Sequence, residues 1–464
     1  MLKVFSRYVP IRSLFFLGSE TCVIVFVVWA ALAWLWPIHD GMSDDWSGRV
    51  FLNAVWVVPL CQLSLYYHDL YLGSRSTPTW RSFVKILQSI GLAALVVLGH
   101  CMLFPESRLG YGMILALAIL PFTLIGWRAA YAKLIASQAF DQRMLLVGTG
   151  RLAEDVVTAL NADPNLGHTI AARLPEFPNA GPRTANLGDR RAEPASLIEF
   201  IRQYRIARVV VAVEDRRGKF PIDELLRCKF SGVKIDDGPS FYERMTGKVH
   251  VDALKPSWLI FSEGFRRHRF TAVMKRGLDV GSALIGLLVI APLIPLIAAA
   301  IKWDSPGPVL YRQERVGAGE KRFVLIKFRS MRANAEKTTG PVWAQNGDER
   351  VTRVGAWLRT FRLDEVPQLV NVLRGEMSIV GPRPERPCFV ETLQAQIPYY
   401  GLRHTVKPGL TGWAQVRYQY GASVQDTIEK LQYDLYYIKN MSLLLDATIL
   451  IETVKIILLR RGAR

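Results

Sequence analysis

The strongest constraint on this chain is a set of four apolar segments within its first 135 residues. They span residues 14–36, 51–71, 83–104 and 111–131. A helix needs roughly 20 apolar residues to cross the hydrocarbon core of a bilayer, and each segment is close to that length. Four such segments in succession favour membrane helices over the buried helices of a soluble domain. We therefore predict four transmembrane helices in residues 1–135.

The charged residues around these segments predict their orientation. Basic residues occur before the first segment, between the second and third, and after the fourth: Lys3, Arg7, Arg12, Arg75, Arg81, Lys85, Arg128 and Lys133. The loop after the first segment is instead acidic, with Asp40, Asp44 and Asp45. Because short loops rich in Lys and Arg stay in the cytoplasm, we expect both the N-terminus and everything after residue 133 to be cytoplasmic.

The chain has 464 residues and a formal net charge of +18, although half of its residues are hydrophobic. A basic protein can bind nucleic acid, but this sequence has neither zinc-finger spacing nor an aromatic ribonucleoprotein motif. We therefore expect no nucleic-acid partner. The five cysteines are scattered and include no Cys-x-x-Cys pair, which argues against a disulfide framework and against a structural zinc site.

Residues 136–262 alternate between strand-like and helix-like patterns, which predicts a Rossmann-like α/β domain with a parallel sheet. The run RMLLVGTGRLAEDVVTAL reads as strand, glycine-rich turn and helix, with Gly148, Gly150 and Ala153 in a G-x-G-x-x-A pattern. Glu176 lies at about the right distance for a ribose contact, but the sequence around it is irregular. Nucleotide binding and a purely structural or regulatory role both remain open for this domain.

A fifth apolar stretch, at about residues 279–301, is bounded by basic residues on both sides. Pro292 and Pro295 interrupt its middle, and each removes a backbone donor and favours a kink. Basic flanks on both sides favour the same cytoplasmic location for both ends. We therefore predict a re-entrant helix that returns to the face it entered from, and retain a spanning helix as the alternative.

Later residues contain two apolar stripes at helical spacing. Val354, Trp357, Leu358 and Phe361 form the first, and the run SLLLDATILIETVKIILLRR forms the second. Such stripes usually face a protein core. Beside a membrane hairpin and basic residues, a location in the membrane interface is equally consistent with them.

The run RLDEVPQLV contains two adjacent carboxylates, Asp364 and Glu365, just before Pro367. Acidic residues before a proline are typical of a helix start, where they cap free N–H groups. Adjacent carboxylates can also serve phosphoryl transfer, with one as nucleophile and the other as a metal ligand. Cations must then offset the charge of a phosphate substrate. Four candidates occur in the same region: Lys327, Arg329, Arg359 and Arg383.

Seven features occur here in the order known from one family. They are MKRGLD, the proline-broken stretch, VLYRQERVG, IKFRSM, VGAWLRTFRLDEVPQLVNVLRGEMSIVGPRPE, VKPGLTGWAQV and DLYYIKNMSLLLD. They resemble the monotopic phosphoglycosyl transferases, the bacterial sugar transferases that begin exopolysaccharide assembly. The resemblance covers about residues 270–459. The whole arrangement is similar to the large members of that family, and most similar to the exosortase-associated exopolysaccharide branch.

The resemblance implies a mostly α-helical catalytic domain at residues 263–464, after a CoA-binding-like domain at residues 136–262. It implies transfer of a sugar 1-phosphate from a UDP-sugar to undecaprenyl phosphate, with release of UMP. Asp364 would attack the β-phosphate to form a covalent phosphosugar intermediate, and Glu365 would coordinate Mg²⁺ beside it. Lys327, Arg359 and Arg383 match positions near the phosphates.

The family's anchoring motif matches Lys275, Arg276 and Asp279, and Asp434 matches an acidic position with a structural or supporting role. The family's helix break is commonly Ser-Pro, whereas this chain has Ala291-Pro292. The missing hydroxyl would have helped to satisfy the bent backbone, so the re-entrant geometry depends here on the prolines.

The implied location is the bacterial inner membrane, with both globular domains on the cytoplasmic face. The implied partners are the lipid bilayer, downstream glycosyltransferases and a second copy of the chain in a homodimer. The sequence does not identify the sugar, whose recognition we expect to involve residues 408–420.

Two other functions are consistent with parts of the sequence. A membrane-tethered nucleotide-sugar epimerase or dehydratase would use the Rossmann-like domain, but residues 139–261 contain no Tyr-x-x-x-Lys pair for proton transfer. A non-catalytic scaffold for polysaccharide assembly would be indifferent to the change Asp364→Asn, whereas a transferase would lose its activity.

Overall fold

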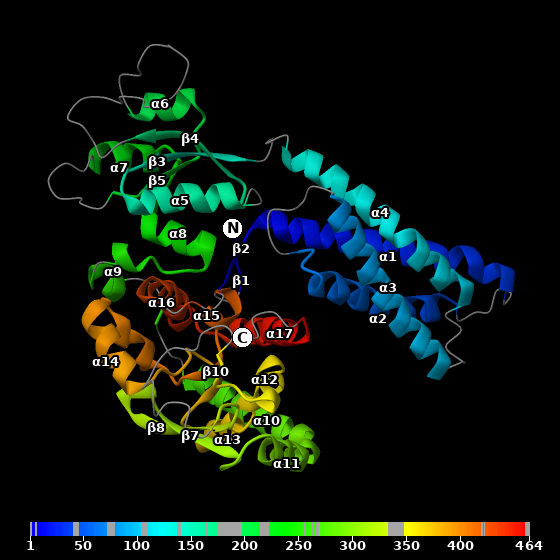
Figure 1. Ribbon diagram of the computed structural model, residues 1–464. Coiled ribbons are helices and arrows are strands. Elements are labelled where there is room, and N and C mark those ends of the chain that lie inside the picture. Colours follow the sequence, from blue (N-terminus) through cyan, green and yellow to red (C-terminus); the bar gives the residue numbers. More distant parts are fainter. Residues whose placement is uncertain are drawn as a thin grey trace. The chain divides into compact units, whose positions relative to one another are not determined.

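The computed structural model describes residues 2–4, 7–39, 46–71, 79–103, 110–136, 141–163, 166–174, 197–213, 222–254, 256–261, 264–265, 269–332, 348–418, 421 and 423–459 (Figure 1). At the N-terminus, β1 (Leu2–Val4) and β2 (Arg7–Val9) form a two-stranded sheet. The chain divides into two compact units. The first comprises Met1–Leu2 and Val9–Gly238, and the second comprises Lys3–Tyr8 and Pro239–Arg464.

Four helices form the first part of the first unit, as predicted from the apolar segments. They are α1 (Ile11–His39), α2 (Trp46–Tyr67), α3 (Trp80–Leu103) and α4 (Gly110–Ala136). Their shared core is apolar and includes Ile24, Val57 and Leu124. Large apolar side chains such as Phe26 and Phe122 face outward and are 65% and 66% exposed. A bundle that is apolar outside as well as inside suits lipid rather than water.

Within the described residues, α1, α3 and α4 contain segments long and apolar enough to cross a bilayer. The side chains of the first turns of α2 lie outside the described residues, so its described apolar part is the shorter segment Val55–Tyr67. Asp40, Asp44, Asp45 and Arg75, which contributed to the predicted orientation, also lie outside the described residues. The helices therefore indicate a membrane protein, and their orientation stays a prediction.

The second part of the first unit is a four-stranded parallel sheet in the order β4-β3-β5-β6. Its strands are β3 (Gln142–Val147), β4 (His168–Leu174), β5 (Arg208–Val211) and β6 (Lys234–Asp237), accompanied by α5 (Arg151–Ala162), α6 (Leu197–Gln203) and α7 (Ile222–Phe230). Parallel strands covered on both faces are continuously apolar, and Met144, Leu145, Leu146 and Val147 of β3 are completely buried. The predicted parallel α/β sheet is present.

The glycine-rich turn after β3 is held tightly against the sheet. Gly148 has φ 129°, and a Cβ there would lie 2.5 Å from the carbonyl oxygen of Ala212, so only glycine fits. Arg173 covers the turn, because its Nε donates to the Gly148 carbonyl at 3.2 Å and its Nη2 pairs with Glu154 at 2.8 Å. Glu176 lies outside the described residues, and nucleotide binding by this domain stays a prediction.

The second unit begins before the point where the sequence placed the catalytic domain. Its first elements are α8 (Gly238–Thr246), η3 (Val251–Ala253) and α9 (Pro256–Phe261). Glu243 of α8 pairs with Lys439 at 2.7 Å, and the Trp413 indole donates to the Gly247 carbonyl at 3.0 Å. Residues 239–262, which the sequence placed with the Rossmann-like domain, therefore pack with the C-terminal unit.

The fifth apolar stretch forms a broken helix. It consists of α10 (Arg269–Ile290), the short 3-10 turn η4 (Ala291–Leu293) and α11 (Ile294–Asp304). Pro292 lies at the start of η4 and Pro295 at the start of α11, where a missing N–H costs least. Few of its side chains are buried, and Leu288 and Val289 are 77% and 68% exposed. The break falls where the prolines predicted it.

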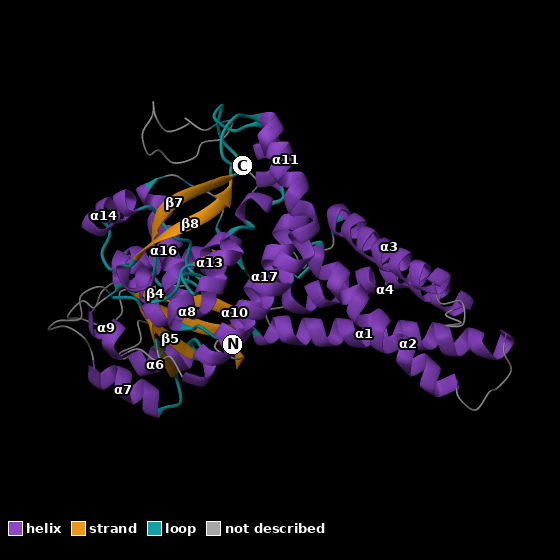
Figure 2. Cartoon of the chain, turned by 90° about the horizontal axis from the view of Figure 1, so that it is seen from below, coloured by secondary structure: helices purple, strands orange, loops and turns teal. Residues whose placement is uncertain are grey.

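The remaining elements surround one hydrophobic core that includes Val372, Tyr400, Leu435, Tyr437 and Ile449. They are β7 (Leu310–Val316), η5 (Ala318–Glu320), β8 (Arg322–Phe328), α12 (Arg353–Thr360), η6 (Leu363–Glu365), α13 (Gln368–Arg374), β9 (Ser378–Val380), α14 (Pro387–Gln396), η7 (Tyr400–Thr405), β10 (Gly409–Thr411), α15 (Trp413–Arg417), α16 (Val424–Lys439) and α17 (Leu443–Leu458). Strands β7 and β8 form an antiparallel hairpin (Figure 2), and β9 and β10 pair in parallel.

The two apolar stripes have mixed roles. In α12, Leu358 is 1% exposed and packs in a smaller apolar cluster with residues of α11 and β8, whereas Trp357 is 55% exposed. In α17, Ile449 is buried, whereas Val454 and Leu458 are exposed. Each helix therefore buries one apolar face inside the second unit and leaves other apolar side chains exposed.

Candidate active site

The two adjacent carboxylates lie in η6, a single 3-10 turn between α12 and α13. Arg362 precedes the turn with φ 56°, a left-handed conformation that is uncommon for a residue other than glycine. Pro367 is the N-cap of α13, so the pair lies just before a helix, as the sequence indicated. Asp364 and Glu365 are each only 7% exposed. Two carboxylates buried this deeply need nearby positive charge.

Three cations surround the carboxylate of Glu365. Its Oε1 lies 2.8 Å from Arg383 Nη2, 3.4 Å from Lys327 Nζ and 3.9 Å from Arg362 Nη1. Burial by itself would raise the pKa of Glu365, but Arg383, Lys327 and Arg362 outweigh it and hold that pKa well below its usual range. Glu365 therefore stays ionised, and the three neighbouring cations balance its negative charge.

Asp364 is in a different environment. Its carboxylate makes no hydrogen bond or ion pair with any residue that the structure describes. Burial and the neighbouring charge of Glu365 raise the pKa of Asp364, while the more distant cations Lys327, Arg359 and Arg383 partly offset that rise. An unpaired carboxylate of raised basicity beside a cationic cluster is suited to act as a nucleophile.

The cations come from separate elements. Lys327 is near the end of β8, where burial lowers the pKa of its ammonium group. Arg359 is in the last turn of α12, and its Nε donates to the Ser330 hydroxyl at 3.0 Å. Gly355 lets α12 approach this closely, because a Cβ there would lie 2.0 Å from the Ser330 carbonyl oxygen. The fold thus concentrates positive charge around one acidic turn.

Arg383 belongs to residues 381–385, Gly-Pro-Arg-Pro-Glu, which we call the GPRPE segment. This segment crosses residues 409–412 at backbone contact distance. A Cβ on Gly409 would lie 2.1 Å from the Gly381 nitrogen, and a Cβ on Gly412 would lie 2.2 Å from the Gly381 oxygen. The glycines of VGPRPE and KPGLTG are therefore needed for the crossing that brings Arg383 to Glu365.

Arg329, predicted as a phosphate-binding cation, contacts the end of α11 in the structure. Its guanidinium donates to the carbonyl oxygens of Ile301, Ser305 and Pro306 at 3.2, 2.6 and 3.0 Å. Cations favour the C-terminus of a helix, where carbonyls lack partners. Arg329 Nη1 and Nη2 thus hold the end of α11, and phosphate binding by Arg329 stays a prediction.

The three residues of the anchoring motif tie α10 to the rest of the second unit. Lys275 pairs with Asp446 at 2.7 Å, and Arg276 donates to the carbonyls of Val372 and Leu373 at the end of α13. Asp279 accepts from the Ser378 hydroxyl at 2.9 Å and from the Ile379 amide at 3.0 Å. Within the described residues, this motif therefore holds α10 against the rest of the second unit.

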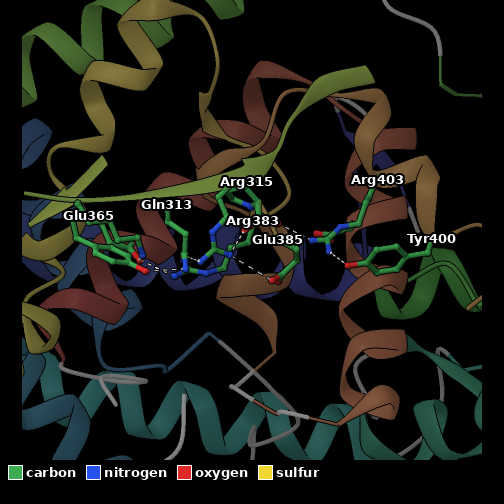
Figure 3. Close-up of polar contacts among 11 residues, drawn as sticks. Gln313, Arg315, Glu365, Arg383, Glu385, Tyr400 and Arg403 are labelled. Atoms are coloured by element: carbon green, nitrogen blue, oxygen red, sulfur yellow. Dashed lines mark hydrogen bonds and ion pairs between the residues drawn. The ribbon is translucent and has the colours of Figure 1, made fainter. Parts of the chain in front are cut away.

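Asp434 is buried and pairs with Arg403 at 3.0 Å. Burial raises the pKa of Asp434 to about 6, although Arg403 opposes the rise. Sequence reasoning identified Asp434 but missed Arg403 and Arg315, which contact the GPRPE segment (Figure 3). It also missed Arg362, which lies 3.9 Å from Glu365. Arg362 could have been found as a basic neighbour of the acidic pair, whereas no local pattern marked the other two.

The carboxylates of this site could bind a divalent metal only if the substrate supplied further ligands. Among the described residues, no group of three or more His, Cys, Asp or Glu side chains could hold a metal ion. Mg²⁺ usually binds through one or two carboxylates together with substrate phosphates and water. Asp364 and Glu365 meet that smaller requirement. A site of this kind is completed by a diphosphate rather than by the protein alone.

Comparison with known proteins shows which family this chain resembles. The profile of the bacterial sugar transferase family matches residues 270–460. The chain is 44% identical over 240 residues to the UDP-N-acetylgalactosamine-undecaprenyl-phosphate N-acetylgalactosaminephosphotransferase of Aeromonas hydrophila, which covers 52% of this chain and 56% of that protein. It is 42% identical over 332 residues to the undecaprenyl-phosphate glucose phosphotransferase of Komagataeibacter xylinus, which covers 69% of this chain and 60% of that protein.

A smaller relative is matched almost completely. The chain is 41% identical over 191 residues to an exopolysaccharide production protein of Rhizobium leguminosarum bv. phaseoli, covering 39% of this chain and 94% of that protein. By contrast, the match spans only 56% and 60% of the two larger relatives. The chain thus spans almost the whole smaller relative but less than two thirds of each larger one, while the family profile matches its residues 270–460.

Proposed function

We propose, from the premise that the chain belongs to the bacterial sugar transferase family, that it transfers a sugar 1-phosphate from a UDP-sugar to undecaprenyl phosphate. The products are UMP and undecaprenyl-diphosphate-sugar, and the reaction is the first membrane step of exopolysaccharide synthesis. The names of the relatives from Aeromonas and Komagataeibacter support this class of reaction. They do not favour the epimerase or dehydratase alternative.

The observation that carries the proposal is the unequal environment of the two carboxylates. Glu365 is held by three cations, whereas Asp364 has no hydrogen-bonding or ion-pairing partner among the described residues. Only Asp364 is therefore available to form a bond to phosphorus without first breaking an ion pair. We therefore assign Asp364 as the nucleophile and Glu365 as the carboxylate that holds the cations in place.

The reaction takes two displacements at phosphorus. An oxygen of Asp364 attacks the β-phosphorus of the UDP-sugar, and the bond from that phosphorus to the bridging oxygen breaks. UMP leaves with the bridging oxygen, and the sugar phosphate remains on Asp364. A phosphate oxygen of the lipid then attacks the same phosphorus, and the carboxylate of Asp364 is released.

Charge neutralisation is the main requirement of both steps, because an anionic nucleophile must approach an anionic diphosphate. Arg383 and Lys327 are placed to share their charge between Glu365 and the substrate, and Arg359 lies near enough to influence the pKa of Asp364. Mg²⁺ held by Glu365 and Asp364 would supply further neutralisation of the diphosphate.

The proposed location is the cytoplasmic face of the bacterial inner membrane, where a UDP-sugar and a lipid phosphate can meet. Both ends of the broken helix contact the same unit, which supports re-entrance. Lys275 and Asp279 hold α10, and Arg329 holds the end of α11. A spanning helix would separate its ends by about 30 Å of hydrocarbon. Apolar side chains exposed on α12 and α17 are suited to the same interface.

The test is a panel of UDP-sugars, including UDP-glucose and UDP-N-acetylgalactosamine, with undecaprenyl phosphate, Mg²⁺ and the purified full chain. We expect UMP release with at least one sugar, and loss of that release in Asp364→Asn while membrane insertion is retained. Radiolabelled sugar phosphate should remain on the wild-type protein when the lipid is omitted. If no sugar releases UMP, the transferase proposal or the choice of nucleotide is wrong.

A further inference from the structure

The GPRPE segment has an unusually complete set of backbone hydrogen bonds. The carbonyl oxygens of residues 382–385 accept, in order, from the Gly409 amide at 2.9 Å, Arg403 Nη2 at 2.9 Å, Arg315 Nη1 at 2.9 Å and the Val316 amide at 3.0 Å. Pro382 and Pro384 have fixed φ and carry no N–H. The backbone on either side of the Arg383 side chain is therefore held by donors from three separate parts of the fold.

Arg403 is the donor that contacts Arg383 itself. It lies in η7 and is 7% exposed. Its Nη2 donates to the Arg383 carbonyl and also lies 3.0 Å from Asp434 Oδ2, while its Nη1 donates to the Tyr400 hydroxyl at 2.5 Å. Figure 3 shows these side chains in a row from Glu365 through Arg383 to Arg403 and Tyr400.

The geometry of arginine makes this contact directional. A guanidinium is planar and its N–H groups form a rigid fork, so partners on two sides fix where the third N–H points. Asp434, on α16, is 2% exposed and Tyr400 is 1% exposed, so neither partner is free to move into solvent. A buried cation that lost Asp434 would be left without its counter-charge, which is strongly destabilising.

We propose that Arg403, oriented by Asp434, is a positioning residue that fixes the main chain of Arg383 and thereby aims its guanidinium at Glu365 and the substrate diphosphate. The inference rests on the proposed function, which gives Arg383 its role. Arg403 does not touch the substrate and acts only through Arg383. Because a displacement of about 1 Å in a catalytic group can cost about 100-fold in rate, a small shift of this carbonyl is enough to matter.

The test is a double-mutant cycle on UMP release by the full chain in detergent or nanodiscs. Arg403→Gln should lower kcat by about 10- to 100-fold and leave the KM for the UDP-sugar within about 3-fold. This is the result expected if the change weakens a contact that Arg383 makes in the transition state. In an Arg383→Ala background, the same Arg403→Gln change should cost less than about 3-fold. Arg403→Lys retains the charge and should recover part of the lost rate.

A matched control is Lys439→Gln, which removes another buried cation of the same unit. Lys439 pairs with Glu243 at 2.7 Å, with the two side chains 9% and 4% exposed, and takes no part in holding the GPRPE segment. Its effect on rate should be the same with and without Arg383. If Arg403→Gln lowers stability too far to purify, Tyr400→Phe and Asp434→Asn are run through the same cycle.

The inference is overturned if Arg403→Gln costs the same factor with and without Arg383, or if it leaves kcat unchanged. That result is distinct from failure of the proposed function, in which the wild-type chain itself releases no UMP from any UDP-sugar.

Discussion

Replacing Arg383 by Gln should be the most damaging single change among the three cations around Glu365. At an effective dielectric constant of about 20, the separations of 2.8, 3.4 and 3.9 Å correspond to attractions of about 6, 5 and 4 kcal/mol for Arg383, Lys327 and Arg362. These three side chains are 29%, 18% and 27% exposed, so solvent screens all of them only in part. Arg383 thus supplies about two-fifths of the charge interaction at Glu365.

The assay is kcat/KM for UMP release at fixed pH and ionic strength. For Arg383→Gln we expect a loss of about 100- to 1,000-fold, the usual cost of removing one donor that stabilises a developing charge. Arg362→Gln, at the longest distance, should lose less than about 10-fold on the same argument. Lys327→Gln should fall between them.

The matched control is Arg322→Gln, which removes the same charge from the same unit at the surface. Arg322 is 57% exposed and its contacts with Glu314 and Glu391 are 3.6 and 3.7 Å long, and exposed pairs of this kind contribute only about 0–1 kcal/mol. Its kcat/KM should stay within about twofold. The reasoning is refuted if Arg322→Gln matches Arg383→Gln, or if Arg362→Gln is the most damaging of the three.

Three further predictions concern pH, packing and topology. Asp434 faces Arg403 of η7, Glu385 of the GPRPE segment and Lys430 of its own helix, and burial raises its pKa from 3.8 to about 6. A raised pKa favours the protonated form in the folded state, so this contribution to stability is full below pH 3.8 and is lost as pH rises through about 6, by at most about 3 kcal/mol. Between pH 4 and 7, the melting temperature of the wild type should therefore fall in part because Asp434 ionises. Asp434→Asn should lack that part of the fall, and an identical pH dependence of the two melting temperatures would contradict the prediction. Gly355→Ala should sharply reduce the yield of folded protein, because a Cβ there would meet backbone at 2.0 Å, whereas Gly277→Ala, with no atom within 4 Å, should fold normally; equal yields of the two variants would show that the crossing is not tight. Cysteines introduced at Thr271 and Ser305 should both be labelled from the cytoplasmic side of intact membranes, and labelling from opposite sides would establish a spanning helix.

Much of the local structure follows directly from residue types. The four apolar segments predict α1 to α4, because only a helix satisfies its own backbone in lipid. The proline pair predicts the break at η4, and the alternation of apolar runs with amphipathic runs predicts the parallel sheet. The first two signals lie within single stretches of consecutive residues, and the third lies in the order of such stretches, so one sequence is enough to read them.

The site is only partly readable in this way. Adjacent carboxylates and nearby basic residues indicate phosphoryl chemistry, but Lys327, Arg329, Arg359 and Arg383 look alike as sequence. The tertiary structure separates them, since Arg383 contacts Glu365 at 2.8 Å while Arg329 is occupied by the carbonyls at the end of α11. Which charges meet depends on contacts between residues far apart in the chain, and no local pattern encodes those distances.

Composition, apolar length and motif order determined by themselves that this is a membrane protein of the bacterial sugar transferase family. Only the tertiary structure decided that Glu365 is surrounded by cations while Asp364 has no hydrogen-bond or ion-pair partner among the described residues, and that Arg403 of η7 contacts Arg383. The physical reason is that hydrophobic pattern and backbone propensity act over neighbouring residues, whereas the pKa of a carboxylate and the direction of a guanidinium are set by whichever groups folding brings within a few ångströms.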